Sequence, residues 1–234
     1  MGHPAGGRLP AWCGLVHRPR RARAARHAML PHVSNALLRY RATTLEVDPL
    51  VRRDELSAAE WTGMLLDRAR VPIWDGVAVR AGQEVTAGLR LAALSDLVPQ
   101  RGVVGRAAAA WVHAGGPRPT KVDVVVPPGV RRPDPHPLRR AAEGPLPDED
   151  VLDLGPGRVT TVQRTGVDVA RFAAPGDVVR LLVGLLPLGF DPHAALAAMR
   201  ELRGGRGVQR ARTLLAELQA VLPPALDRAE LRRG

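Results

Sequence analysis

The alternation of hydrophobic and polar positions predicts a helix that leads directly into a hairpin near residues 57–80. Ser57 and Glu60 have the spacing of a capping box, which marks the start of a helix with Trp61 on its buried face. Two short apolar segments then flank Asp75-Gly76, a dipeptide that favours two-residue hairpin turns. A helix followed by a tight hairpin is typical of the second half of a winged helix. Residues 47–100 are therefore predicted to form a winged-helix-like domain.

The next part of the chain changes period repeatedly, which predicts a mixed α/β segment. The expected elements are a helix at 86–97, a strand at 103–104, a helix at 106–113, a strand at 121–126 and a strand pair at 151–154 and 158–160. Residues 131–147 are rich in proline and arginine and show neither period, so they are predicted to be a long surface connection.

From Thr160 to residue 222 the apolar spacing becomes helical. Thr160 and Gln163 are expected to form a second capping box, and further helices are expected at 177–186, 192–203 and 207–222. The predicted fold class is therefore α+β. A winged-helix N-terminal domain precedes a mixed segment and a mostly helical C-terminal domain at 101–222, and residues 223–234 form a tail.

Most of the positive charge lies near the N-terminus. The formal net charge is +11, but eight arginines precede the first acidic residue, Glu46, which leaves +3 for residues 46–234. Residues 1–46 are expected to be a disordered basic leader. They are either partly upstream sequence ahead of a natural start at Met29, or a basic arm that follows DNA phosphates. The charge of the remaining chain does not by itself indicate nucleic-acid binding.

Composition and spacing argue against several classes of protein. The single cysteine, Cys13, excludes an internal disulfide and a cysteine-rich zinc site, and fits a reducing cytoplasm. The scattered histidines His113, His136 and His193 lack metal-ligand spacing, and no nucleophile–base pair or phosphate-binding loop is present. No segment has the length of a membrane span. We therefore expect a cytoplasmic protein that is not an enzyme and uses no cofactor or metal.

Two segments carry motifs that point to a known family. Val159-Thr160, Arg164-Thr165 and Asp168 form the pattern V-T-x-x-x-R-T-x-x-D at an expected strand-to-helix junction. Upstream, Val104-Gly105-Arg106 leads into the small-residue helix Ala107–Trp111. Over roughly residues 47–222, this order of motifs resembles the AbiEi-like antitoxin family of actinobacterial abortive-infection systems.

The resemblance implies a regulator that binds double-stranded operator DNA, represses its own operon and counteracts a nucleotidyltransferase toxin. The chain differs from the family because only one clear helix precedes the expected wing. It also lacks the repair-endonuclease-like domain into which related chains continue, so DNA cleavage is not implied. The alternative is a protein-interaction module that kept the scaffold without a DNA or toxin role.

Candidate site residues follow from the winged-helix interpretation and from the motif. In a winged helix, exposed helix residues enter the major groove and basic residues near the wing contact phosphates. The candidates for DNA contact are Arg52, Arg53, Thr62, Arg68, Arg70 and Arg80, although the same arginines could simply keep a small domain soluble. In the motif, Arg164, Thr165 and Asp168 either fix the helix against the preceding strand or face a partner. Trp61, Trp74 and Trp111 are expected in the core.

Overall fold

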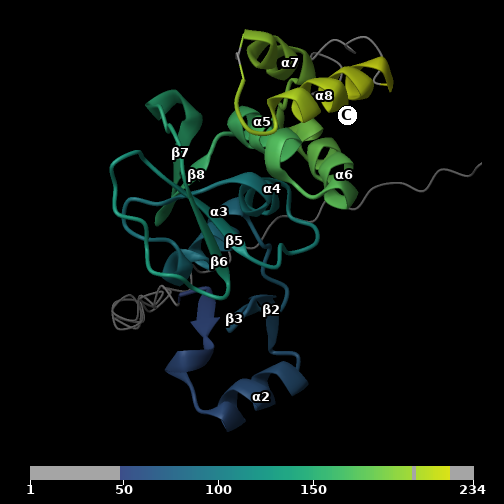
Figure 1. The fold of residues 1–234 in the computed structure, drawn as a ribbon. Coiled ribbons are helices and arrows are strands. Elements are labelled where there is room, and N and C mark those ends of the chain that lie inside the picture. The colour runs from purple at the N-terminus through teal and green to yellow at the C-terminus, as the bar shows by residue number, and fades with distance from the viewer. Residues whose placement is uncertain (1–47, 202–203, 222–234) are drawn as a thin grey trace, which may run out of the picture. The chain divides into compact units, whose positions relative to one another are not determined.

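The computed structural model describes residues 48–201 and 204–221 (Figure 1). The predicted basic leader, with Cys13 and Met29, lies outside the described residues, as does the predicted tail at 223–234. The described part contains two β-sheets and a group of C-terminal helices, which agrees with a mixed α and β fold.

The first sheet has three antiparallel strands in the order β1-β3-β2. They are β1 (Leu50–Arg52), β2 (Arg70–Trp74) and β3 (Val77–Arg80). Helix α2 (Ala58–Leu66) connects β1 to β2 after a 3-10 turn at Arg53–Glu55. Ser57 caps α2, because its hydroxyl accepts from the Glu60 N–H while the Glu60 carboxylate accepts from the Ser57 N–H at 2.9 Å. The predicted capping box is confirmed.

The predicted hairpin is also confirmed, but it does not project like a free wing. Trp74 pairs with Val77 across Asp75-Gly76, and Gly76 adopts a left-handed φ of +67°, which glycine accepts without strain. Strand β3 is the middle strand of the sheet, and Val77, Ala78 and Val79 are only 4%, 0% and 1% exposed. The apolar part of the hairpin is therefore core.

The second sheet has five strands in the order β6-β5-β4-β8-β7. They are β4 (Val103–Val104), β5 (Val122–Val126), β6 (Arg139–Glu143), β7 (Val151–Leu154) and β8 (Gly157–Thr160). The β4–β8 and β5–β6 pairs are parallel, and the other neighbours are antiparallel. Strand β6 lies inside the segment predicted to be a surface connection, so that prediction is wrong. An edge strand pairs through its backbone and needs no apolar alternation, which is why the pattern Arg-Arg-Ala-Ala-Glu concealed it.

Two helices pack against the sheets and complete the first core. They are α3 (Ala87–Ala92), which is followed by a 3-10 turn at Ser95–Leu97, and α4 (Arg106–Ala114). The helix predicted at 86–97 is thus shorter than expected, because the Arg52 guanidinium binds the Ala92 carbonyl at 3.0 Å and the chain continues as a 3-10 turn after that residue. The core extends from Leu50 to Val159 and crosses the domain boundary predicted at residue 100.

Four helices enclose a second core beside α4 (Figure 1). They are α5 (Val162–Phe172), α6 (Pro175–Leu185), α7 (Pro192–Glu201) and α8 (Val208–Val221). The N-cap of α5 is Thr161, not the predicted Thr160, which ends strand β8 and is fully buried. Asp191 caps α7, because its carboxylate accepts from the N–H groups of His193 and Ala194.

Within the described residues, no single helix has the length and apolar character to cross a membrane. The segments Pro175–Leu188 and Pro192–Arg200 together meet both requirements, but they bend by 116° at the break between them.

Candidate nucleic-acid interface

Three of the predicted DNA-contacting arginines gather at the end of the first sheet that lies away from the hairpin turn. Arg70 and Arg80 are directly opposite each other in the β2–β3 ladder, and Arg68 precedes β2 by two residues. Opposite residues of an antiparallel pair share one face of the sheet, with their Cβ atoms about 5 Å apart. The two guanidinium groups are therefore carried on the same face at close range.

These three arginines lack compensating carboxylates. Among the described residues, none of them forms an ion pair, and the Arg70 side chain makes only a 3.4 Å hydrogen bond to the Pro49 carbonyl. Arg68 and Arg80 are exposed, and Arg68 has a left-handed φ of +53°. Like charges directly opposite in a ladder are destabilising, so an anion between them would relieve repulsion that the fold retains.

Arg52 occupies a different environment. Its guanidinium forms an ion pair with Asp96 and donates to the Ala92 carbonyl at 3.0 Å and the Ser95 hydroxyl at 2.8 Å. The Arg52 side chain is 20% exposed. These bonds join β1 to α3 and the turn that follows it, so the donors of Arg52 are committed inside the fold.

Arg53 and Thr62 are exposed, but their surroundings differ. Arg53 lies beside the hairpin turn, where its N–H donates to the Gly76 carbonyl at 2.8 Å. A shallow hollow at this place is lined by the carboxylates of Asp54, Asp75 and Asp96, together with Arg52 and Arg53. Thr62 lies on the solvent side of α2. Because three aspartates outnumber two arginines here, the turn end of the sheet is less favourable for phosphate than the Arg70–Arg80 end.

The tryptophans predicted to be in the core are there. Trp61, Trp74 and Trp111 are 9%, 5% and 3% exposed. The rings of Trp74 and Trp111 lie 5.3 Å apart at 49°, which joins the first sheet to α4. Among the residues that the structure describes, the buried indole N–H of Trp74 has no hydrogen-bond partner. These rings are not available to stack on bases.

The motif residues Arg164, Thr165 and Asp168 come together at the start of α5. The Arg164 guanidinium binds Asp168 at 3.0 Å, Asp150 at 2.6 Å and the Pro145 carbonyl at 3.1 Å. The Thr165 hydroxyl is 3.1 Å from the Thr160 carbonyl. Burial raises the pKa of the Asp168 carboxyl, and the attraction of Arg164 only partly opposes this shift. These contacts fix α5 against β8 and the loop before β7.

The acidic residues 148–150 contribute one member to this network. Asp148 and Glu149 are exposed, but Asp150 is part of the Arg164 network.

A second charged cluster was missed by the sequence analysis. The Arg106 guanidinium lies 4.3 Å above the Phe172 ring and 3.9 Å from the Asp123 carboxylate, which also contacts Arg140 at 3.4 Å. The Arg171 guanidinium lies 4.7 Å from the same ring. Burial raises the pKa of the Asp123 carboxyl, although Arg140 and Arg106 lower it. The signal in the sequence was Asp123 itself, a lone carboxylate within the apolar strand β5.

The described residues contain no group of three or more His, Cys, Asp or Glu side chains that could hold a metal ion. His113 uses its Nε2 atom in a 2.7 Å hydrogen bond with the Thr160 carbonyl, and burial lowers the pKa of its imidazole.

No family model matches this chain, and a search of curated proteins finds no similar sequence. The resemblance to AbiEi-like antitoxins therefore rests on the motifs quoted above.

Proposed function

We propose that this protein is a DNA-binding transcriptional regulator that resembles AbiEi-like antitoxins. In this role it represses its own operon in the cytoplasm and counteracts a nucleotidyltransferase toxin. The observation that carries the DNA-binding part is the end of the first sheet, where Arg68, Arg70 and Arg80 gather and form no ion pair with any carboxylate in the described part of the chain. The order β1, α2, β2, β3 is also that of the second half of a winged helix, which supports the same function.

In the proposed complex, two surfaces of the protein contact the DNA. The exposed face of α2, which carries Thr62, enters the major groove, while the three arginines contact phosphates beside it. Arg52 is not among the contacts, because its donors bind Asp96, Ser95 and Ala92. Sequence preference then comes from α2, and the salt-dependent part of the affinity comes from the arginine cluster.

The test is fluorescence anisotropy of the full chain on labelled DNA from upstream of its own gene, measured at several salt concentrations. Each phosphate contact contributes about 0.9 to the slope of log affinity against log salt. Arg70→Gln and Arg80→Gln are each expected to flatten the slope by about one unit. Arg210→Gln, an exposed arginine of α8, is the matched control and should leave the slope unchanged.

Unchanged slopes in both Arg70→Gln and Arg80→Gln would show that these arginines carry only surface charge. Equal affinity for the upstream DNA and for unrelated duplexes would remove the regulatory function, because a repressor binds its operator far more tightly than other sequences.

A second function, a protein-interaction module, is favoured by one observation on α6. Val179 and Val183 are 56% and 48% exposed and lie one helical turn apart, so they form an apolar stripe on the solvent side. This alternative predicts that the purified chain self-associates in sedimentation equilibrium. The double change of Val179→Ser and Val183→Ser should abolish the self-association and leave the DNA affinity unchanged.

A further inference from the structure

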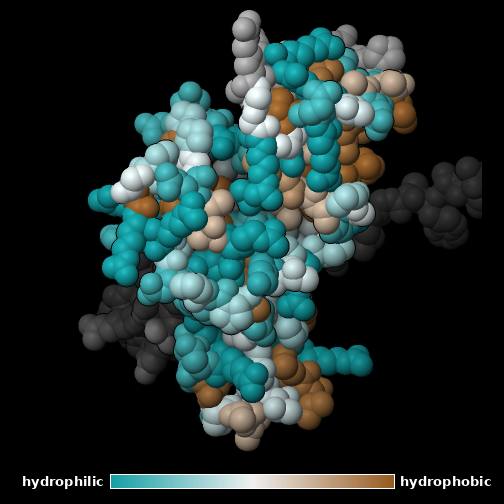
Figure 2. Space-filling model, in the orientation of Figure 1, coloured by the Kyte–Doolittle hydropathy of each residue, from teal (hydrophilic) through white to brown (hydrophobic). Residues whose placement is uncertain are grey.

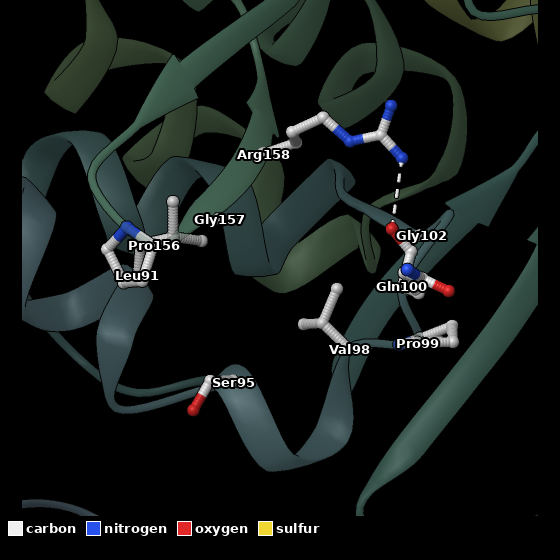
Figure 3. Close-up of a pocket in the computed structure, with 9 residues that line it drawn as sticks. All are labelled: Leu91, Ser95, Val98, Pro99, Gln100, Gly102, Pro156, Gly157 and Arg158. Atoms are coloured by element: carbon white, nitrogen blue, oxygen red, sulfur yellow. Dashed lines mark hydrogen bonds between the residues drawn. The ribbon is translucent and has the colours of Figure 1, made fainter.

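A cavity of about 180 Å³ lies between α3 with its following turn, the Pro99–Gly102 loop and the start of β8 (Figure 3). Its walls combine the apolar side chains of Leu91, Val98, Pro99 and Pro156 with the polar residues Ser95, Gln100 and Arg158. In Figure 3 the Val98 side chain points into the cavity, whereas the Ser95 hydroxyl points away from it. That hydroxyl already accepts a hydrogen bond from Arg52, so it is not a free hydrogen-bonding group of the cavity.

Two glycines at the edge of this cavity let the backbone pack closely on neighbouring side chains. A Cβ atom on Gly102 would lie 2.8 Å from Val124, and one on Gly157 would lie 3.2 Å from Leu91. A side chain does not fit at Gly102 and would be tight at Gly157, so the backbone packs closely on its neighbours at two sides of the cavity. The remaining space is therefore bounded by structure that cannot easily close inward.

One guanidinium supplies the charge of the cavity. Arg158 extends along one side toward Gln100, and its Nη2 atom makes a long, 3.4 Å hydrogen bond to the Gln100 carbonyl (Figure 3). Within the described ranges Arg158 forms no ion pair, even with Asp153, its opposite residue in the β7–β8 ladder. A guanidinium has five donors, so most of its hydrogen-bonding capacity is unused by the protein.

We propose that this cavity binds a small monocarboxylate whose apolar body has about six carbon atoms. An apolar protein cavity of about 150 Å³ accepts benzene, so the volume here suits a body of that size. The carboxylate pairs with Arg158 through two parallel N–H···O bonds. A phosphate group is a poorer match, because it needs several converging donors and this cavity offers one guanidinium. Binding here does not depend on the proposed DNA function.

The experiment is a titration of the ¹⁵N-labelled full chain with benzoate, followed by the backbone amide signals of Leu91, Gly102 and Gly157. Benzamide is the neutral control of the same shape. A ligand of this size is expected to bind with a dissociation constant on the order of 1 mM. Because a hydrogen bond to a charged group is lost, benzamide is expected to bind at least about tenfold more weakly.

Two variants locate the site and one controls for surface charge. Arg158→Gln is expected to weaken benzoate binding about tenfold, because it removes the charge. Val98→Leu places an extra carbon in the cavity and is expected to weaken benzoate and benzamide alike. Arg101→Gln changes an exposed arginine beside Gln100 that does not line the cavity, and should bind benzoate as the wild type does.

The proposal is overturned if benzoate causes no saturable shifts at these amides. It is also overturned if benzamide binds as tightly as benzoate, or if Arg158→Gln and Arg101→Gln affect benzoate binding equally. Each of these results is read from the amide signals of folded protein, so a variant that fails to fold is replaced by the comparison of benzoate with benzamide on the wild type.

Discussion

Two helical glycines are expected to respond in opposite directions to the same substitution by alanine. Gly166 lies within α5 and Gly63 within α2. A Cβ atom on Gly166 would lie 2.1 Å and 2.3 Å from two ring carbons of Phe190, whereas a Cβ on Gly63 would have no heavy atom within 4 Å. Comparable gains in helix propensity, about 1 kcal/mol, apply to both sites.

At Gly166 the packing against Phe190 decides whether alanine raises or lowers the free energy of unfolding. Non-bonded carbon atoms prefer separations of about 3.5–4.0 Å, so the Phe190 ring must move by more than an ångström in a close-packed core. Phe190 is 4% exposed and belongs to the second core, so its ring is surrounded by packed side chains. Overpacking of this kind costs about 1–3 kcal/mol, and the large overlap places Gly166→Ala near the upper end. The net expectation is a loss of about 2 kcal/mol.

The assay is urea unfolding followed by circular dichroism. Gly63→Ala should raise the free energy of unfolding by up to about 1 kcal/mol. The two variants then differ by about 3 kcal/mol, which separates their urea midpoints by about 1.5 M for a slope near 2 kcal/mol per molar. A second cycle introduces Phe190→Ala, which removes the ring atoms that clash. In that background Gly166→Ala should be neutral or stabilising, which corresponds to a coupling of about 2 kcal/mol.

The reasoning is refuted if Gly166→Ala stabilises the protein as much as Gly63→Ala does. A penalty of the same size with and without the Phe190 ring would equally refute it, because the cost would then arise elsewhere than at this contact.

Three further predictions concern charged groups. Arg52→Ala should lower the free energy of unfolding by about 1–3 kcal/mol in urea denaturation, because it leaves Asp96 and the Ala92 carbonyl without their donor. A change of less than about 0.5 kcal/mol, which is typical of a surface site, would contradict the structural role of Arg52. Burial raises the pKa of the Asp168 carboxyl in the folded state above its ordinary value of 3.8, so its contribution to stability is full below pH 3.8 and falls as pH rises through the folded pKa. The wild type should therefore lose stability relative to Asp168→Asn as pH rises through the acid range. A gain in the stability of the wild type relative to Asp168→Asn over the same range would contradict the sign. Burial lowers the pKa of the His113 imidazole below 6.5, so its contribution to the free energy of unfolding is present above pH 6.5 and is lost as pH falls through the folded pKa. An NMR titration of this imidazole with a midpoint above 6.5 would contradict the prediction.

Local features of this protein could be predicted because their interactions span only a few residues. The Ser57–Glu60 capping box and the Trp74–Val77 pair that closes the Asp75-Gly76 turn each join groups three positions apart. The chain there contains everything that the local conformation needs. The Thr160–Thr161 ambiguity shows the limit, because either threonine could cap α5 and only the pairing of Thr160 with β7 makes Thr161 the cap.

The candidate site was predictable as a set of residue types, but not as an arrangement. The sequence grouped Arg52 with Arg70 and Arg80 because all three are basic and close along the chain. Their separate roles depend on Asp96, which is 44 positions from Arg52 and engages its guanidinium, and on a strand register that sets Arg70 opposite Arg80.

By itself, the sequence determined the short-range signals: where helices begin, where the chain reverses and which apolar residues alternate with polar ones. Only the tertiary structure decided that β6 joins the second sheet, that the hairpin is half core and that Arg106 lies between Asp123 and Phe172. Backbone pairing at a sheet edge needs no particular side chains, and an ion pair between distant segments forms only after the chain has already folded. Such contacts leave no periodic trace in the sequence from which to infer them.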